Sequence, residues 1–146
     1  MHIADESAEG LVWVRRCHCE LSDLVSLPEN RSFKEETASS LFRQLARGVA
    51  ALHGHGYSHG DIKTNNILLA IQEGGPSLMR TDYALKLTDW TTMSAMNEKS
   101  VRRQKNTYCA PEAIDDDYDT KAADIWQLGL VLLWMLANPV EARPLK

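Results

Sequence analysis

The sequence contains few of the residues that mark several large classes of protein. Glycine occurs 8 times and proline 5 times in 146 residues, too rarely for a collagen-like or low-complexity chain. Three cysteines are an odd number and too few for a disulfide scaffold. The longest apolar run, residues 128–137, has about half the length of a membrane-spanning helix. We therefore expect neither a disulfide-rich protein nor one that spans a membrane.

Neither sign of charge dominates the chain. Lys and Arg number 16 and Asp and Glu 20, and the net charge of −4 argues against a general nucleic-acid binder. Residues 1–10 are polar and acidic, do not resemble a secretory leader, and are expected to be frayed. The few cysteines then favour a reducing, intracellular setting, in the cytoplasm or the nucleus.

Apolar residues make up 44% of the chain, enough for one globular domain with a core. Their spacing predicts that this domain is mainly α-helical with short β-hairpins. A stripe at spacings of three and four predicts a helix over 33–52; its members are Ala38, Leu41, Leu45, Val49 and Leu52. Residues 67–69 predict a buried strand, with 84–88 as its hairpin partner. A second helix over 121–137, capped by Thr120, is apolar on most faces and is expected to be deeply buried beside the first.

Four short motifs stand in a fixed order in the rest of the chain. They are HGDIKTNN at 59–66, DWT at 89–91, APE at 110–112 and DIWQLG at 124–129. In this order and spacing the chain resembles the protein kinase family over about residues 11–137. The resemblance implies a partial kinase domain of the serine/threonine type at 11–146, running from the hinge to the anchoring helix of the larger, C-terminal lobe. We expect it to be truncated, without the N-terminal β lobe and the final helices.

The resemblance also implies a role for each motif residue in phosphoryl transfer from ATP. That reaction needs the acceptor hydroxyl in line with the γ-phosphate and shielding of the phosphate charge. Asp61 is implied to accept and orient the substrate hydroxyl, and Lys63 to direct a positive charge at the same phosphate. Asn66 and Asp89 are implied to bind Mg²⁺, which prefers oxygen ligands. A protein substrate that accepts on Ser or Thr follows from the same resemblance.

Further residues are implied to bind the nucleotide. Leu68 would form the floor under the adenine, in a stack with Val131 and Met135. Cys17 and Cys19 fall in the hinge segment that would line the base. These cysteines and the nearby histidines lack the Cys-x-x-Cys spacing of structural zinc, so no zinc site is expected.

Other motif residues are implied to be structural or regulatory. His59 and Trp90 would stack as the lower part of the regulatory spine, and Asp124 would anchor the backbone of the 59–66 loop. Glu112 is expected to be partly buried without the Arg that usually pairs with it.

The motifs depart from the family pattern at three positions. Gly60 replaces the usual Arg before Asp61, and Thr91 replaces the usual Gly, where a β-branched residue restricts the backbone. Lys105 stands where serine/threonine kinases carry a Thr that touches the catalytic residues, and Thr107 is two residues too late to replace it.

Two functions remain open at this point. One is a serine/threonine kinase, active in a complete parent and inactive in the isolated chain. The alternative is a catalytically inactive, kinase-like module that binds or scaffolds partners.

Overall fold

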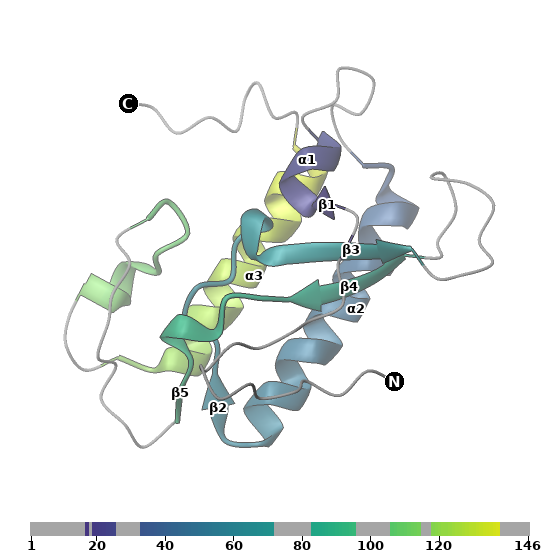
Figure 1. The fold of residues 1–146 in the computed structure, drawn as a ribbon. Helices are drawn as coiled ribbons and strands as arrows, with labels where there is room; N and C mark the ends of the chain where they lie inside the picture. Colours follow the sequence, from purple (N-terminus) through teal and green to yellow (C-terminus); the bar gives the residue numbers. More distant parts are fainter. Residues whose placement is uncertain are drawn as a thin grey trace.

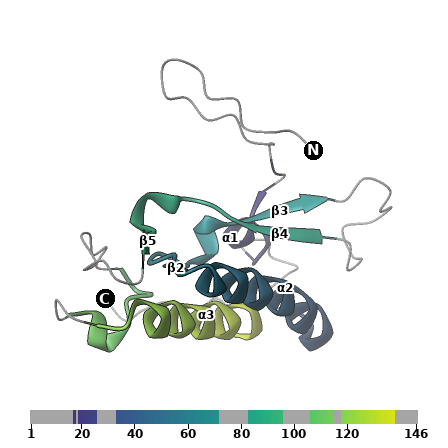
Figure 2. The same ribbon diagram turned by 90° about the horizontal axis from the view of Figure 1, so that it is seen from below.

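A computed structural model of the chain describes residues 17, 19–25, 33–71, 83–95, 106–114 and 118–137. Its elements, with η for a 3-10 helical turn, are β1 (Cys19–Glu20), α1 (Leu21–Val25), α2 (Glu35–Gly54), β2 (Tyr57–Ser58), η1 (Thr64–Asn66), β3 (Ile67–Ile71), β4 (Tyr83–Leu87), η2 (Trp90–Thr92), β5 (Ser94–Ala95), η3 (Pro111–Ile114) and α3 (Thr120–Leu136). The helices α2 and α3 lie side by side in one layer, and a short sheet covers them (Figures 1 and 2). The expected mainly helical fold with short hairpins is confirmed.

Helix α2 supplies half of the helical layer. It begins two residues later than predicted and ends at Gly54. The predicted stripe is buried at Ala38, Leu41, Leu45 and Val49, whereas Leu52 at the end of the helix is only half-buried. Since the buried positions recur every three or four residues, one face of the helix packs on α3 and the sheet.

Helix α3 differs from its prediction in two ways. Its N-cap is Asp119 rather than Thr120, because the Asp119 Oδ1 atom accepts hydrogen bonds from the backbone of Lys121 and Ala122, at 2.9 and 3.2 Å. The helix is also not buried all round. Its exposed side chains include Ile125, Trp126, Leu133 and Leu136. Within the described ranges, α3 packs against α2, β2 and η3. These neighbours cover only part of its apolar surface, so an apolar sequence alone does not bury every face of a helix.

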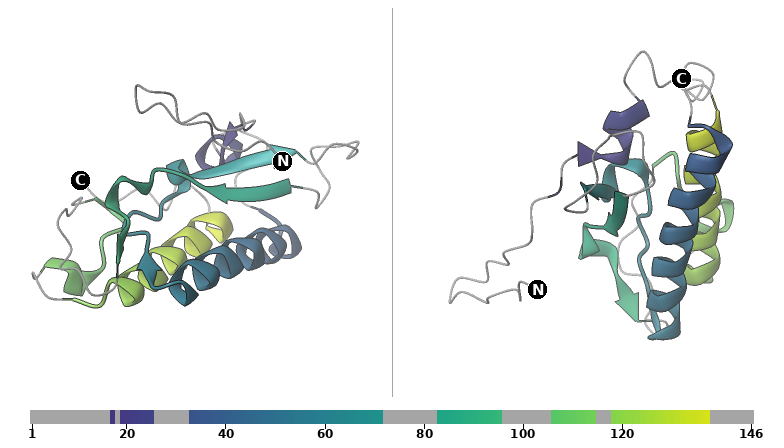
Figure 3. Two further views of the ribbon diagram at one scale, coloured as in Figure 1. Left: turned by 60° about the horizontal axis from the view of Figure 1, so that its bottom comes forward. Right: turned by 90° about the vertical axis from the view of Figure 1, so that its right-hand side faces the viewer.

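The sheet has the antiparallel order β1-β3-β4. Ile67 lies opposite Leu87 and Leu69 opposite Leu85, as the predicted hairpin requires. Because side chains alternate along a strand, Ile67 and Leu69 are fully buried over the helices while Leu68 stays half-exposed on the opposite face. The right-hand view of Figure 3 shows the helices on one side and the sheet with α1 on the other.

Some sequence expectations cannot be placed in this fold. The frayed end expected at 1–10 and residues 11–16 of the partial domain lie outside the described residues. Among the residues that are described, no helix combines the length and the apolarity needed to cross a bilayer.

The N-cap of α3 gives a paired test of the fold. Changing Asp119→Ala removes the acceptor of two helix N–H groups, and we expect it to lower the free energy of unfolding by about 1 kcal/mol. Changing Thr120→Ala, one residue away, should alter it by less than about 0.5 kcal/mol. Urea denaturation of both variants measures the difference; equal losses would mean that Thr120 shares the capping role.

Candidate active site

The 59–66 loop runs from β2 to β3 and ends in η1. One buried carboxylate holds it to α3. Asp124 is fully buried, and its two oxygens accept hydrogen bonds from the backbone N–H groups of His59 and Gly60 at 2.9 and 2.8 Å. The His53 Nε2 atom, from α2, donates to the same carboxylate at 2.8 Å. Asp124 therefore anchors the loop backbone, as the sequence predicts, and joins it to both long helices.

Gln127 holds the same loop one helical turn further along and was missed by the sequence reasoning. Its Oε1 atom accepts from the backbone N–H of Ile62 at 2.7 Å, and its Nε2 atom donates to the carbonyl of Gly60 at 3.3 Å. A polar residue three positions after Asp124 on an otherwise apolar helix was the available signal, because both lie on one helix face.

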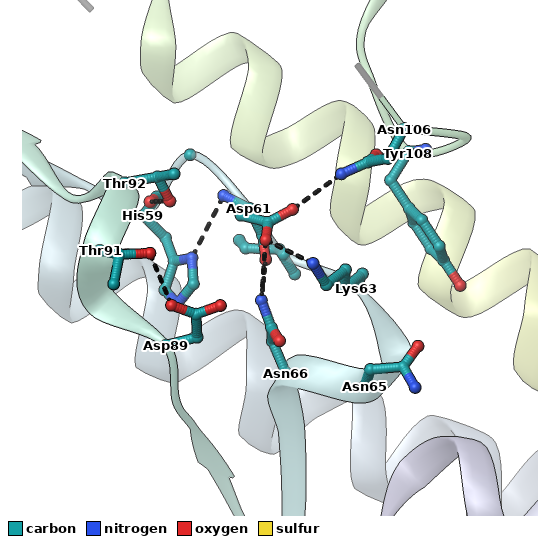
Figure 4. A network of polar contacts seen from close by, with 12 residues as sticks. His59, Asp61, Lys63, Asn65, Asn66, Asp89, Thr91, Thr92, Asn106 and Tyr108 are labelled. Atoms are coloured by element: carbon teal, nitrogen blue, oxygen red, sulfur yellow. Dashed lines mark hydrogen bonds and ion pairs between the residues drawn. The ribbon is translucent and has the colours of Figure 1, made fainter. Parts of the chain in front are cut away.

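Asp61 lies at the centre of a polar cluster (Figure 4). Its Oδ2 atom accepts from the Lys63 Nζ atom at 2.6 Å and from the Asn66 Nδ2 atom at 3.0 Å. The Asn66 amide also donates to the Asp61 carbonyl at 2.9 Å. Asp61 is 1% exposed, so three of the predicted site residues form one fixed, largely buried unit.

Asn106 reaches this cluster from a segment far along the chain. Its Nδ2 atom donates to the Asp61 Oδ1 atom at 2.8 Å, while its own Oδ1 atom accepts from the backbone N–H of Tyr108 at 2.8 Å. The Tyr108 hydroxyl contacts the Thr64 hydroxyl at 3.1 Å. Thr107, two residues after the position of the usual Thr, is exposed.

Asp89 lies beside His59 and Thr91 at the edge of the cluster (Figure 4). Its backbone is left-handed, with φ 62° and ψ 72°, a conformation that Asp tolerates better than most residues. The Thr91 hydroxyl donates to the Asp89 Oδ1 atom at 2.6 Å. This hydrogen bond, more than the nearby charge of Lys63, lowers the pKa of Asp89 and keeps it ionised.

His59 is buried and neutral. Its Nε2 atom donates to the Thr88 carbonyl at 3.1 Å, and its Nδ1 atom accepts from the backbone N–H of Asp61 at 3.3 Å, which fixes the tautomer. Burial lowers the pKa of this imidazole despite the acidic groups around it. Its ring lies 4.8 Å from that of Trp90 at an interplanar angle of 53°, so the two rings make a tilted contact rather than the predicted stack.

Two of the residues predicted to bind the nucleotide, Cys19 and Leu68, lie on adjacent strands of the sheet. Cys19 in β1 lies opposite Leu69 of β3, next to Leu68, and burial raises the pKa of its thiol. Cys17 and Leu68 are half-buried. Val131 and Met135 lie fully buried in the core cluster that also contains Leu69. The predicted stack of Leu68 with Val131 and Met135 is therefore wrong, because side chains alternate along β3 and Leu68 faces away from this cluster.

Glu112 corrects one expectation. It is exposed, because η3 turns Ala110 and Ala113 toward Ala123 of α3 and leaves the carboxylate in solvent. The expected penalty for a partly buried unpaired carboxylate therefore does not arise.

The oxygen atoms of the cluster fit a hard cation that is shared with phosphate. Asn66 directs its amide nitrogen at Asp61, so its oxygen is the atom left for another partner. Asp89 adds an ionised carboxylate, and Mg²⁺ commonly takes one or two protein oxygens together with phosphate and water. Within the described part of the chain, no three His, Cys, Asp or Glu side chains form a metal-binding group of their own.

Comparison with known proteins identifies the family. A family model described as the protein kinase domain matches residues 3–143. The chain belongs to the protein kinase family.

Similar kinases support this assignment. The serine/threonine-protein kinase ksp1 of Schizosaccharomyces pombe is 33% identical over 127 residues, which cover 80% of this chain and 26% of that protein. The testis-specific serine/threonine-protein kinase 3 of Mus musculus is 32% identical, covering 90% of this chain and 47% of that kinase. An Aurora kinase of Yarrowia lipolytica is 30% identical, covering 96% and 36%. The chain thus spans less than half the length of these relatives.

The fold explains the glycine that departs from the kinase pattern at position 60. Gly60 has φ +83°, and a Cβ atom there would lie 3.0 Å from the carbonyl oxygen of Thr92. The Thr92 hydroxyl donates to the carbonyl of His59 at 2.9 Å, which holds η2 against the loop. A side chain at position 60 would have a strained backbone and would press on η2, which would have to give way slightly.

Two glycines give a matched test of this close approach. Gly56 has the same backbone twist, φ +86°, but an added Cβ would meet nothing within 4 Å. Changing Gly56→Ala should cost about 1 kcal/mol of stability from backbone strain alone. Changing Gly60→Ala should lower the stability clearly more than Gly56→Ala does, because η2 must also shift to admit the new Cβ. Thermal unfolding measures both, and equal losses would contradict the tight packing against Thr92.

The Thr91 hydroxyl gives a test that depends on pH. Changing Thr91→Val removes the bond that lowers the pKa of Asp89, so that pKa should rise in the variant. Because the folded-state pKa is depressed, the bond stabilises the fold above about pH 3.9, the usual pKa of aspartate, and is lost as the pH falls through the lower, folded value. NMR titration of the Asp89 carboxyl carbon measures the shift. Thr91→Ser keeps the hydroxyl and should behave like the natural protein.

Proposed function

We propose that this chain supplies the hydroxyl-orienting base and the Mg²⁺ ligands of a serine/threonine protein kinase, as its larger lobe. The observation that carries this proposal is the buried Asp61 carboxylate, which accepts hydrogen bonds from Lys63 and Asn66 at one oxygen and from Asn106 at the other. Kinases accelerate phosphoryl transfer mainly by positioning and by stabilising charge, and a rigid, charged cluster suits that task.

Each member of the cluster then has a distinct part in the reaction. Asp61 accepts a hydrogen bond from the Ser or Thr hydroxyl of the protein substrate and orients it for attack. Lys63 balances the Asp61 charge at 2.6 Å and places a cation where the transferred phosphate gathers negative charge. Asn66 and Asp89 would hold Mg²⁺. When bound, ATP supplies the phosphoryl group and Mg²⁺ shields the charge on its oxygens.

The neighbouring residues preserve this arrangement. Neutral His59 accepts the backbone N–H of Asp61, and Asp124 fixes the two residues before it. The half-exposed face of β3 at Leu68 is the surface that we assign to the adenine, whereas the Cys19 side chain, opposite Leu69, packs on the core side of the sheet.

A kinase-like binding module is a second candidate, and one observation favours it. The Thr91 hydroxyl already occupies one oxygen of Asp89 at 2.6 Å. A carboxylate engaged in this way has less capacity left for a cation, so partner binding without catalysis is the competing function.

An assay of phosphate transfer separates the two candidates. Because the chain spans less than half of its relatives, the assay uses the full natural protein that contains it, with Mg²⁺, ATP and a generic protein substrate. Changing Asp61→Asn should lower the rate by at least about a hundredfold, since general-base groups contribute about 10² to 10⁴. Asp89→Asn should also abolish transfer, because it removes the ionised ligand for Mg²⁺.

Asp119→Asn is the matched control. It makes the same chemical change at an exposed carboxylate, and Asn still caps a helix well, so the rate should be unchanged. Natural protein that transfers no phosphate, or an Asp61→Asn variant as fast as the natural one, would favour the binding module.

A further inference from the structure

The Asn106 contact is the part of the cluster that the kinase motifs do not account for. In the kinase pattern a Thr five residues before the Ala-Pro-Glu motif touches the catalytic residues, but this chain has Lys105 there. The contact to Asp61 comes instead from the next residue, Asn106, 2.8 Å from Asp61 Oδ1. It is the hydrogen bond that the structure gives to this oxygen, whereas Oδ2 accepts from both Lys63 and Asn66.

The Asn106 side chain is itself held in a fixed orientation. Its oxygen accepts from the backbone N–H of Tyr108, so its nitrogen must be the atom that faces Asp61. The Tyr108 hydroxyl meets Thr64 at 3.1 Å, and Thr64 is buried at the end of the same loop. The 106–108 segment is therefore held to the 59–66 loop at two points, Asp61 and Thr64; Figure 4 shows the first of them.

We propose that Asn106 is the positioning residue that sets the orientation of the Asp61 carboxylate for the substrate hydroxyl. This inference rests on the proposed kinase function. Without the Asn106 donor, Oδ1 loses this hydrogen bond, and the carboxylate is held at Oδ2 alone by Lys63 and Asn66, so its orientation is less tightly fixed. Its lone pairs would then leave the direction in which a hydroxyl must approach.

The isosteric change Asn106→Asp isolates this donor. The new side chain keeps an oxygen for the Tyr108 N–H but faces Asp61 with a second carboxylate oxygen instead of an N–H. Within the described residues, Lys63 and His59 contact Asp61, Asp89 and Asp124 lie near His59, and all four are the same in every variant. Thr107→Asp is the control, because it adds the same charge at the exposed neighbouring position.

The first measurement is kinetic and uses the full natural protein. We expect Asn106→Asp and Asn106→Ala to lower kcat by about tenfold or more, with the KM for ATP nearly unchanged, since a small misplacement of a reacting group is costly. Asn106→Asp should also move the acidic limb of the kcat/KM profile to higher pH, because two adjacent carboxylates raise each other's pKa. Thr107→Asp should change neither quantity.

The second measurement does not depend on activity. The Asn106→Asp variant should melt at a lower temperature than the natural protein at pH 7.5 and recover as the pH falls toward 5. A raised folded-state pKa means that the folded variant binds a proton before the unfolded one does. The proton restores a donor between the two carboxyl groups. Thr107→Asp should show no such recovery.

The outcomes separate this inference from the function on which it rests. Unchanged or increased kcat in both Asn106 variants, in a protein that Asp61→Asn silences, would overturn the positioning role and leave the kinase function standing. If the natural protein transfers no phosphate, the proposed function fails, and with it the catalytic part of this inference. The melting comparison still decides whether Asn106 and Asp61 form the contact, and a loss of stability that does not vary with pH would refute it.

Discussion

The arrangement of the site depends on burying the carboxylate of Asp124. A carboxylate removed from water is strongly destabilising unless its oxygens are paired, and here three donors from α2 and the 59–66 loop satisfy them. Because the backbone at residues 59 and 60 is held from below, the next residue, Asp61, leaves the loop in a defined direction. The helical layer is thus the fixed base on which the chemistry of the loop is oriented.

The polar residues that lie over the helical layer form a network in which the buried groups are paired. In the part of the chain that the structure describes, every buried side-chain nitrogen or oxygen has a hydrogen-bond partner. Such networks hold one geometry when every member is paired and become costly when one partner is removed. The arrangement therefore favours catalysis that works by positioning, in which the geometry of Asp61 matters more than the strength of any single bond.

The sequence predicts the periodic and local parts of this structure well, because they depend on neighbouring residues. The stripe of α2 and the hairpin of β3 and β4 are of this kind. The cap of α3 was misplaced because Asp119 and Thr120 are both capping residues, and only the backbone path decides between them. The Asn106 contact joins positions 45 residues apart, and neither periodicity nor a motif specifies which atom of a distant segment reaches Asp61.

The two departures from the kinase pattern that involve glycine, at positions 60 and 91, lie where η2 meets the 59–66 loop. Gly60 has no side chain, so the Thr92 carbonyl can approach to a distance that any Cβ would obstruct. That approach brings η2 against the loop, where the Thr92 hydroxyl bonds to His59 and the Thr91 hydroxyl supports Asp89 in its left-handed conformation. Relative to the kinase pattern, position 91 carries Thr instead of Gly and position 60 carries Gly instead of Arg. Where the pattern has a flexible glycine beside Asp89, this chain has a hydroxyl bonded to the Asp89 carboxylate. The Thr92 hydrogen bond and the close approach at Gly60 tie the Asp89 segment to the Asp61 loop, so a change that frees one of them should disturb the other.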